Sequence, residues 1–203
     1  MTRLDRLIEA ERKLIGKSSY ARKSTSLLMK LINVVVGLFN KYFMTRYTTT
    51  IGTTTYIADS LLTPNGDNEE AIQVELHEFV HKWDYVHGKV KFVFGYLFSG
   101  KRRSLYELRG YTMNMYWYWL RARLVVDPNE YVKYFTGPDY LWMARDGEWV
   151  WKELASRQRM FMENEEAFLS LPGSEPYKFA KEFMKTEGLL YGQQAESTSQ
   201  LAN

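Results

Sequence analysis

The sequence predicts an α+β fold that is mostly α-helical, and three observations support this prediction. Most of the chain carries apolar residues at the spacing that places them on one face of a helix. Residues 47–57 instead contain six threonines beside isoleucine and tyrosine, a composition typical of β-strands. Residues 68–86 have a helical pattern that includes the pentapeptide His77-Glu78-Phe79-Val80-His81. We therefore expect a helical protein with a small threonine-rich sheet.

The composition bounds the size and type of the protein. With 203 residues, 45% of them hydrophobic, the chain fits one domain with a sizeable core. It has no cysteine, which excludes disulfides and cysteine-ligated metal sites. Residues 1–50 hold ten Lys/Arg against three Asp/Glu, although the whole chain carries only +3. A solvated face is the default interpretation of this basic segment; membrane contact is an alternative, and we do not expect nucleic-acid binding.

Residues 1–46 are predicted to form a basic, helical N-terminal extension. A first helix over residues 2–16 ends at Gly16, and a second begins after Ser24 or Ser26 and runs to Phe43. The second helix is apolar around most of its circumference, so we expect it to pack against the core or to dock on a protein partner. Its apolar run is interrupted by polar residues and follows a charged segment. We therefore expect no secretion signal, no transmembrane span and a cytoplasmic location.

Residues 47–57, which begin with Tyr47 and end with Ile57, are the predicted β-structure. Gly52 lies near their centre and allows two arrangements, a bulge in one edge strand or the turn of a hairpin. An edge strand beside a metal site can bind an extended peptide through main-chain hydrogen bonds. This segment is therefore the predicted binding strand for a peptide or protein substrate.

The motif helix is predicted to run from about Asn68 to Tyr85 or the residue after it. A turn precedes it, and Asp67 followed by Glu70 resembles a capping box at its start. The apolar residues of this helix share one face, which we expect to meet the core: Ile72, Leu76, Phe79, Val80 and Trp83. The histidines lie beside that face, where packing can hold them at the edge of a cleft.

His77 and His81 are four residues apart, so both imidazoles project from one face of the helix and can reach one metal ion. Glu78 lies between them, where its carboxylate can take a proton from metal-bound water. The pattern His-Glu-x-x-His on a helix is typical of zinc metallopeptidases. The alternative is a surface helix with an ordinary Glu78–Lys82 pair.

A catalytic zinc ion normally has three protein ligands and a water, so the motif needs a third ligand. His87 lies six residues after His81, a spacing that resembles the metzincins, although Asp84 stands where they have glycine. Glu107, followed by Gly110, resembles the pattern by which the gluzincins supply a glutamate from a second helix. This resemblance favours Glu107, and His87 stays open as the alternative.

Residues 47–120 also resemble small gluzincin-like proteins of bacteria and tailed phages. In those proteins an aromatic helix and a basic turn, here residues 92–98 and 102–103, link the two metal helices. The resemblance implies a minimal zincin-like metallopeptidase domain over residues 47–190, with a threonine-rich edge sheet. It implies Zn²⁺ as the cofactor, with His77, His81 and Glu107 as ligands and Glu78 as the general base.

Two residues beside Glu107 qualify this resemblance. Gly110 stands where alanine is commoner in the family, and we expect the glycine to loosen the helix slightly. Tyr111, one turn after Glu107, is the predicted catalytic donor to the oxyanion of a tetrahedral intermediate. Packing in the core is the alternative role for this tyrosine.

The remainder of the chain is predicted to be helical, with a polar tail at residues 191–203. The Glu107 helix continues through residues 113–126 and ends at Asp127 and Pro128. Shorter helices are expected at residues 129–134, 148–166 and 175–185, with turns at residues 137–138 and 146–147.

A structural role is the second functional hypothesis. The N-terminal helices, the aromatic surplus and the polar tail exceed what a minimal peptidase domain needs. A virion-assembly protein could retain a zincin fold and use its metal site for stability or a latent activity. Its assembly partner would then dock on the N-terminal helices, and its location would be the virion.

Overall fold

A computed structural model of the chain describes residues 1–37, 41–45, 47–62, 68–137 and 143–193. Most of these residues are helical and a small mixed sheet accompanies them, which confirms the α+β, mostly α class. The elements are α1 (Arg3–Ile15), β1 (Ser19–Arg22), α2 (Leu27–Val36), β2 (Thr49–Ile51), β3 (Thr54–Ile57), η1 (Asp59–Leu61), α3 (Glu69–Gly88), α4 (Val90–Phe98), α5 (Gly100–Ala122), α6 (Asn129–Thr136), α7 (Gly147–Glu163), α8 (Glu165–Ser170) and α9 (Glu175–Thr186).

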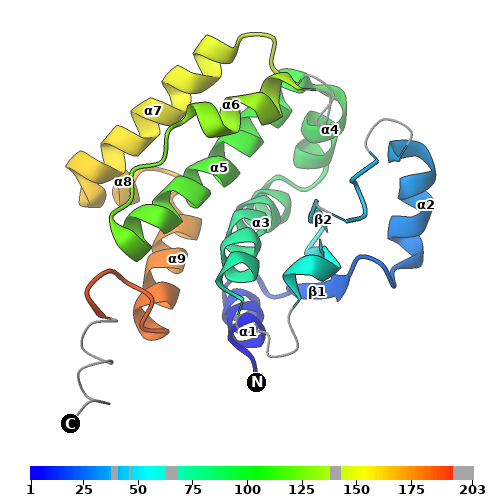
Figure 1. The fold of residues 1–203 in the computed structure, drawn as a ribbon, viewed down its shortest axis with the longest axis horizontal. Helices are drawn as coiled ribbons and strands as arrows, with labels where there is room; N and C mark the ends of the chain where they lie inside the picture. The colour runs from blue at the N-terminus through cyan, green and yellow to red at the C-terminus, as the bar shows by residue number, and fades with distance from the viewer. Residues whose placement is uncertain (38–40, 46, 63–67, 138–142, 194–203) are drawn as a thin grey trace.

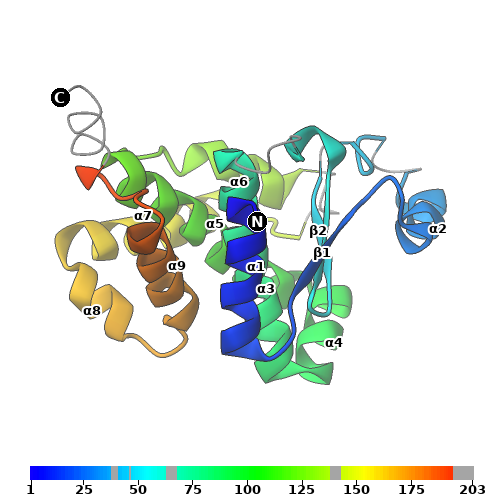
Figure 2. The ribbon, with the colours of Figure 1, turned by 90° about the horizontal axis from the view of Figure 1, so that it is seen from below.

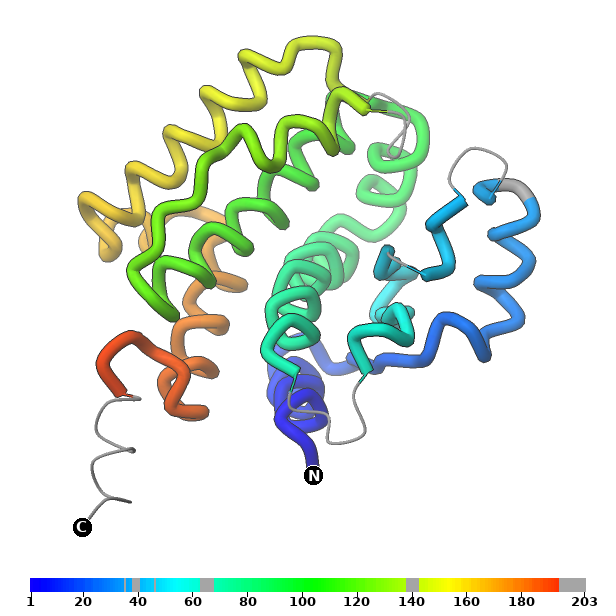
Figure 3. The backbone as a smooth tube through the Cα atoms, in the orientation of Figure 1, coloured from blue at the N-terminus to red at the C-terminus, as the bar shows by residue number. Residues whose placement is uncertain are grey.

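The motif helix α3 lies at the centre of the fold (Figures 1 and 3). α5 and α1 pack along it, and α4, α9 and the β2–β3 hairpin contact it as well. α7 packs on α5, with α6 and α8 against α7. Buried side chains from α1, α3 and α5 to α9 meet in one core, including Leu7, Leu76, Met113 and Met184. The motif helix is therefore held from several sides, so its side chains have little freedom to move.

The sheet has the strand order β1-β3-β2, with β1 parallel and β2 antiparallel to β3. Gly52 has a φ of +64° and turns the chain between β2 and β3. Of the two predicted arrangements the hairpin is confirmed, and a single edge strand over residues 47–57 is wrong. β1 and β2 form the two edges, and β3 lies between them. β1 is too short to produce a recognisable alternating pattern, and the sequence did not predict it.

Helix α2 differs most from its prediction. It begins after Ser26, whose Oγ accepts a hydrogen bond from the Met29 amide at 3.3 Å, as predicted for a capping serine. It ends at Val36 rather than Phe43. Met29 is buried, but Leu27 is 73% and Leu31 62% exposed, so the prediction that this helix packs against the core is wrong. One side of the helix, with Leu27, Leu31 and Val34, faces solvent instead.

α3 begins and ends close to its predicted limits. The side chain of Asn68 caps it by accepting from the Glu70 amide, and the predicted cap Asp67 lies outside the described residues, as does the turn at 63–67. At the other end Lys89 has a φ of +44° and connects α3 directly to α4. A lysine in this region of φ is strained, and here it folds α4 back towards α5.

The C-terminal helices follow the predictions with two corrections. α5 ends at Ala122, where Arg123 adopts the left-handed conformation, rather than continuing to residue 126. The predicted helix 148–166 is two helices, because Asn164 ends α7 and its side chain caps α8. Asp146 is the N-cap of α7 rather than part of a separate turn. The helices predicted at 129–134 and 175–185 are confirmed as α6 and α9. Pro138 and the tail after residue 193 lie outside the described residues.

The N-terminal segment shares the core and the sheet with the rest of the chain. α1 contributes Leu4 and Leu7 to the core, and β1 pairs with β3 in the register Ser19 to Thr54. The boundary between residues 46 and 47 stays a prediction. Within the described residues, no helix combines the length and the apolar character needed to cross a bilayer.

Candidate metal centre

The two histidines of the motif meet Glu107 between α3 and α5. The Nε2 atoms of His77 and His81 lie 3.3 Å apart. His81 Nε2 is 3.5 Å from Glu107 Oε1, and His77 Nε2 is 3.7 Å from Glu107 Oε2. Each residue offers a ligand atom within 4.8 Å of the others, and all three residues are buried. Three side chains of types that can ligate a metal, one of them from a distant part of the sequence, therefore converge on one point.

These separations suit a zinc ion. Two ligand atoms that each lie about 2.1 Å from a tetrahedral zinc ion are about 3.4 Å apart. The observed separations of 3.3, 3.5 and 3.7 Å lie close to that spacing. Glu107 Oε2 is buried without a hydrogen-bond partner among the described residues, so it retains the lone pairs that a cation would take. Two imidazoles and one carboxylate are also a known catalytic zinc donor set.

The electrostatics of the three residues also favour a cation. Burial opposes the charged form of His81, but Glu107, Glu78 and Asp84 outweigh it and raise the pKa of His81 to about 9. Burial would raise the pKa of Glu107, but the neighbouring imidazoles His81 and His77 lower it well below the usual range. Glu107 is therefore ionised at neutral pH. A metal ion would replace the proton that His81 otherwise holds.

Gly110 allows α3 and α5 to approach closely at the site. A Cβ atom at this position would lie 2.5 Å from His77 Nε2 and 2.6 Å from its Cε1, distances at which atoms overlap. The alanine that is commoner in the resembling family would therefore displace the His77 ring in this chain. The predicted loosening of the helix is secondary to this contact, because only glycine leaves room for the ring.

Tyr96 is a site residue that the sequence analysis missed. It lies on α4, and its hydroxyl donates a hydrogen bond of 2.5 Å to Glu107 Oε1. This bond orients the carboxylate and leaves Oε2 as the oxygen without a partner. The signal in the sequence was a tyrosine within the otherwise apolar run 92–98. The sequence predicts the aromatic helix, but no pattern in it indicates that this helix folds back over Glu107.

His87 lies apart from the three converging residues. α3 remains helical through Asp84 to Gly88, so the chain does not turn at Asp84 as the metzincin pattern would need. His87 is exposed, stacks on Trp83 with ring centroids 4.1 Å apart, and donates from Nδ1 to the Trp83 carbonyl. Asp84 instead pairs with Arg109 at 2.6 Å, which ties α3 to α5. His87 does not belong to the converging group.

The two predicted catalytic residues lie beside this group. Glu78 is 8% exposed, and its charge acts on His81 and on the buried Lys23. Tyr111 is 6% exposed; its ring meets that of His77 edge-on and stacks on that of Tyr134. Tyr111 therefore packs against a predicted ligand within the core. The roles of general base and oxyanion donor stay predictions.

Lys23 is a buried lysine that binds the start of β2 and lies within electrostatic range of Glu78, and it was not predicted. Its Nζ donates to the Tyr47 carbonyl at 2.8 Å and to Thr49 Oγ1 at 2.7 Å, and it lies 3.6 Å from the centre of the Phe43 ring. Burial lowers the pKa of Lys23 to about 8, and the charge of Glu78 opposes that shift. The lysine thus fixes the start of β2 close to the motif helix.

A second buried charge cluster, which we call the lysine cluster, consists of Lys82, Glu11, Glu75 and Ser18. Lys82 follows His81 on α3, and its Nζ donates to Glu11 at 3.0 Å, to Ser18 at 2.8 Å and to Glu75. Lys82 and both glutamates are 0% exposed. The alternative interpretation of the motif, a surface Glu78–Lys82 pair, is wrong because Lys82 is buried and binds residues of α1 and α3.

No family model matches this chain, and no curated protein or solved structure matches it either.

Proposed function

We propose that the protein is a zinc-dependent amide hydrolase, a metallopeptidase in its simplest form. The observation that carries the proposal is the convergence of His77, His81 and Glu107, whose ligand atoms lie within 4.8 Å of one another. A histidine pair one helical turn apart, with a glutamate from a second helix, is the donor set of catalytic zinc sites that hydrolyse amides.

The roles of the residues follow from their positions. His77 and His81 would bind the metal through Nε2, and Glu107, oriented by Tyr96, would bind through a carboxylate oxygen. A bound zinc ion would lower the pKa of water and polarise the substrate carbonyl. The Glu78 carboxylate would accept a proton from water and deliver it to the leaving amine. Tyr111 would donate to the developing oxyanion.

The substrate would bind along the edge of the sheet. β2 is the edge strand that contacts α3, and one side of its main chain has no neighbouring strand among the described residues. An extended peptide could add to this edge by backbone hydrogen bonding. Lys23 holds the start of β2 through Tyr47 and Thr49 and also interacts with Glu78. This arrangement supports a peptide or protein substrate.

The test combines metal content with hydrolysis. Purified wild-type protein should hold about one zinc ion per chain, whereas Glu107→Ala should lose it and His87→Ala, the matched control, should retain it. Cleavage of an internally quenched peptide library should disappear in Glu78→Gln while zinc stays bound. Wild-type protein that stays folded but binds no zinc would overturn the proposal. Equal activity in Glu78→Gln would overturn the catalytic role of that residue.

Burial of the site favours a second candidate, a structural or virion-assembly protein that uses zinc for stability. His77, Glu78, His81 and Glu107 are all 8% exposed or less, which is closed for a site that must admit a substrate. Titration of cobalt-substituted protein with acetohydroxamate distinguishes the hydrolase from the structural protein. A change in the cobalt spectrum means that the fourth ligand position is open, as an enzyme requires. An unchanged spectrum supports the structural role.

A further inference from the structure

Two acid-free segments of the sequence lie together at one end of the molecule. Residues 12–58 contain eight Lys/Arg and residues 85–106 contain five, and neither segment has an aspartate or a glutamate. The first includes α2 and the β2–β3 hairpin, and the second includes α4. Both views of the ribbon place these elements away from α7, α8 and α9 (Figures 1 and 2). Positive charge is therefore concentrated at this end of the fold.

The same elements expose apolar stripes to solvent. On α4, Val90, Phe94, Leu97 and Phe98 are 66%, 59%, 60% and 77% exposed and follow helical spacing along one face. The face of α4 that packs on α5 is formed by Gly95 and by rings such as Tyr96. The outer face of α4 is thus apolar, the reverse of an ordinary surface helix.

Helix α2 repeats this arrangement. Leu27, Leu31 and Val34 lie on one face and are 73%, 62% and 69% exposed. Lys30 is also exposed on this helix. Two separate helices therefore each present a row of large apolar side chains with lysine beside it. Solvent exposure of so much apolar surface is costly for a monomeric protein and marks a surface that binds something.

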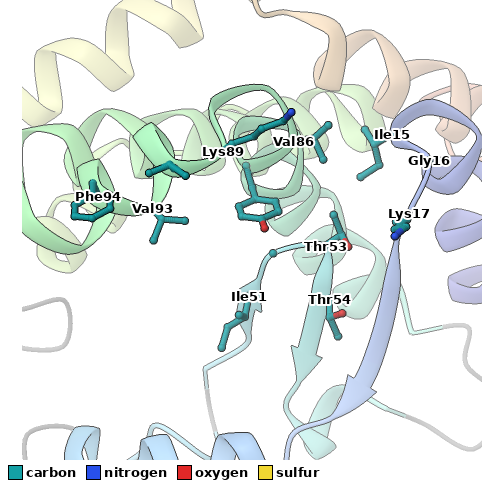
Figure 4. Close-up of a pocket in the computed structure, with 13 residues that line it drawn as sticks. Ile15, Gly16, Lys17, Ile51, Thr53, Thr54, Val86, Lys89, Val93 and Phe94 are labelled. Carbon is teal, nitrogen blue, oxygen red and sulfur yellow. The ribbon is translucent and has the colours of Figure 1, made fainter.

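A groove of about 820 Å³ lies between the hairpin and α4, and the end of α1 also lines it (Figure 4). Ile51 and Thr53 from the hairpin face Val93 and Phe94 from α4, with Lys89 at the rim. The stripes extend beyond this groove, because its lining includes none of the three exposed α2 residues and neither Leu97 nor Phe98. An occupant confined to the groove would leave those side chains in water. A partner that covers both stripes must therefore have a surface wider than a single peptide.

We define the basic apolar face as the exposed apolar and basic side chains of α2, the hairpin, α4 and the segments that flank α4: Leu27, Leu31, Val34, Ile51, Val90, Phe94, Leu97, Phe98, Lys30, Lys89, Lys91 and Lys101. Within the described part of the chain, no carboxylate forms an ion pair with these four lysines. They are available to an external anion.

We propose that the basic apolar face docks on the surface of an anionic lipid bilayer. The apolar stripes would enter the headgroup region, and the lysines would contact lipid phosphates and carboxylates. Charge decides between the broad occupants. A second copy of the chain would bring two acid-free, positive faces together, which repel each other. Nucleic acid would satisfy the lysines but would leave the aliphatic side chains of both stripes without a partner.

The test is co-sedimentation of the full chain with vesicles. Wild-type protein should bind phosphatidylcholine vesicles that contain about 30% phosphatidylserine, bind pure phosphatidylcholine at least about tenfold more weakly, and dissociate in high salt. The double variant Phe94→Ser/Phe98→Ser should bind about tenfold more weakly or worse, because it removes the largest inserted side chains. Lys89→Gln/Lys91→Gln should also bind about tenfold more weakly or worse.

The matched control is Trp151→Ser/Met160→Ser on α7, which removes exposed apolar side chains from the opposite end of the molecule. It should bind vesicles within about twofold of wild type, and all variants should keep the wild-type melting temperature within a few degrees. Zinc content should not change, so failure of docking is separable from failure of the proposed hydrolase.

Any one of five outcomes would overturn the proposal. The first two are that wild-type protein fails to bind the anionic vesicles, and that it binds neutral and anionic vesicles equally. The third is that the α7 control loses as much vesicle binding as the α4 variant does. The fourth is that the protein dimerises with increasing concentration and the α4 variant abolishes dimerisation but not vesicle binding. The fifth is that a DNA oligonucleotide binds the protein as tightly as anionic vesicles do and displaces the vesicles.

Discussion

The motif helix α3 carries two buried clusters of charge, and they are built differently. The metal cluster of His77, His81 and Glu107 faces α5, while the lysine cluster around Lys82 faces α1. In both clusters a buried carboxylate retains an oxygen without a hydrogen-bond partner among the described residues. The difference is the cation. Lys82 Nζ supplies it on one side, whereas on the other side three ligand atoms face one another.

This difference separates a cluster that holds the fold from one suited to a ligand. A lysine amine bonded to two glutamates satisfies its charge from within the chain and joins α1 to α3. Three ligand atoms at a spacing that suits zinc, kept close by a glycine, provide a site for an ion from outside. Substitutions in the first cluster should therefore affect folding, and substitutions in the second should affect zinc binding.

The largest effect is expected from Lys82→Met. Removing the amine leaves Glu11 and Glu75 buried without their cation, and breaking a buried ion pair in this way costs about 3–5 kcal/mol. Urea denaturation in EDTA measures the loss without a contribution from metal. Lys178→Met, at an exposed position on α9, is the control and should cost less than about 0.5 kcal/mol. A similar small loss in Lys82→Met would show that the lysine cluster does not stabilise the fold.

Zinc itself should give the next largest effect. At a free zinc concentration about 1,000 times the dissociation constant, binding should stabilise the fold by about 4 kcal/mol. Calorimetric scans with zinc and with EDTA measure this increment. His77→Ala and Glu107→Gln should abolish it, whereas His87→Ala and Glu75→Gln should retain it. An increment that survives in Glu107→Gln would mean that zinc binds the chain elsewhere.

The pH dependence of stability should separate the clusters further. Burial and the negative charge of Glu11 raise the pKa of Glu75 to about 8, and the lysine opposes the shift. A folded-state pKa above the unfolded value stabilises the fold fully below the unfolded pKa, about 4.5, and the stabilisation is lost as the pH rises through 8. In EDTA we expect stability to fall from pH 5 to 9, with His81, whose pKa is about 9, contributing in the same direction.

Glu75→Gln should reduce the loss of stability between pH 5 and 9 by an amount on the order of 1 kcal/mol, because glutamine imitates the protonated acid at every pH. At the metal cluster, the stabilisation that zinc provides should change with pH in the opposite direction. Zinc needs neutral imidazoles, so the zinc increment should grow as the pH rises. Urea titrations at several pH values, with and without zinc, measure both trends. A wild-type slope that Glu75→Gln leaves unchanged would contradict the assignment to this residue.

The sequence predicted the parts of the fold that depend on local pattern. The limits of α3, α6 and α9 follow from periodicity and capping, whereas the hairpin at Gly52 is one of two arrangements that the sequence left open. The exposed position of α2 could not be predicted, because an apolar helix is normally expected to be buried. The pairing of β1 with β3 connects residues 35 positions apart, as in Ser19 with Thr54, and no local pattern specifies such a pairing.

The candidate site divides in the same way. The i, i+4 spacing of His77 and His81 placed them together from the sequence alone. Glu107 came from a resemblance and not from any local rule, and the structure brings it to the histidines. Tyr96 and Lys23 could not be predicted, because each depends on a fold-back of the chain, one at Lys89 and one after β1. Residues that position others are the ones that sequence patterns leave out.

Gly110→Ala should produce the smallest change in stability and still separate the clusters. Alanine favours a helix over glycine by about 1 kcal/mol, so the metal-free protein should lose little stability or even gain some. Its Cβ, however, would lie 2.5 Å from His77 Nε2, so the ring must move. Because a displaced ligand loses metal affinity, we expect zinc to bind about 10 to 100 times more weakly.

Gly95→Ala is the matched control, since it also replaces a glycine in a helix beside the site. Its Cβ would approach the flexible side chain of Arg102 at 3.0 Å, and that side chain can move away. Competition with a zinc chelator measures both affinities, and urea denaturation in EDTA measures both stabilities. If Gly110→Ala binds zinc as tightly as Gly95→Ala does, the His77 ring is free to shift without loss of the metal. The close approach of α3 and α5 would then serve packing alone, and zinc binding by the metal cluster would not depend on it.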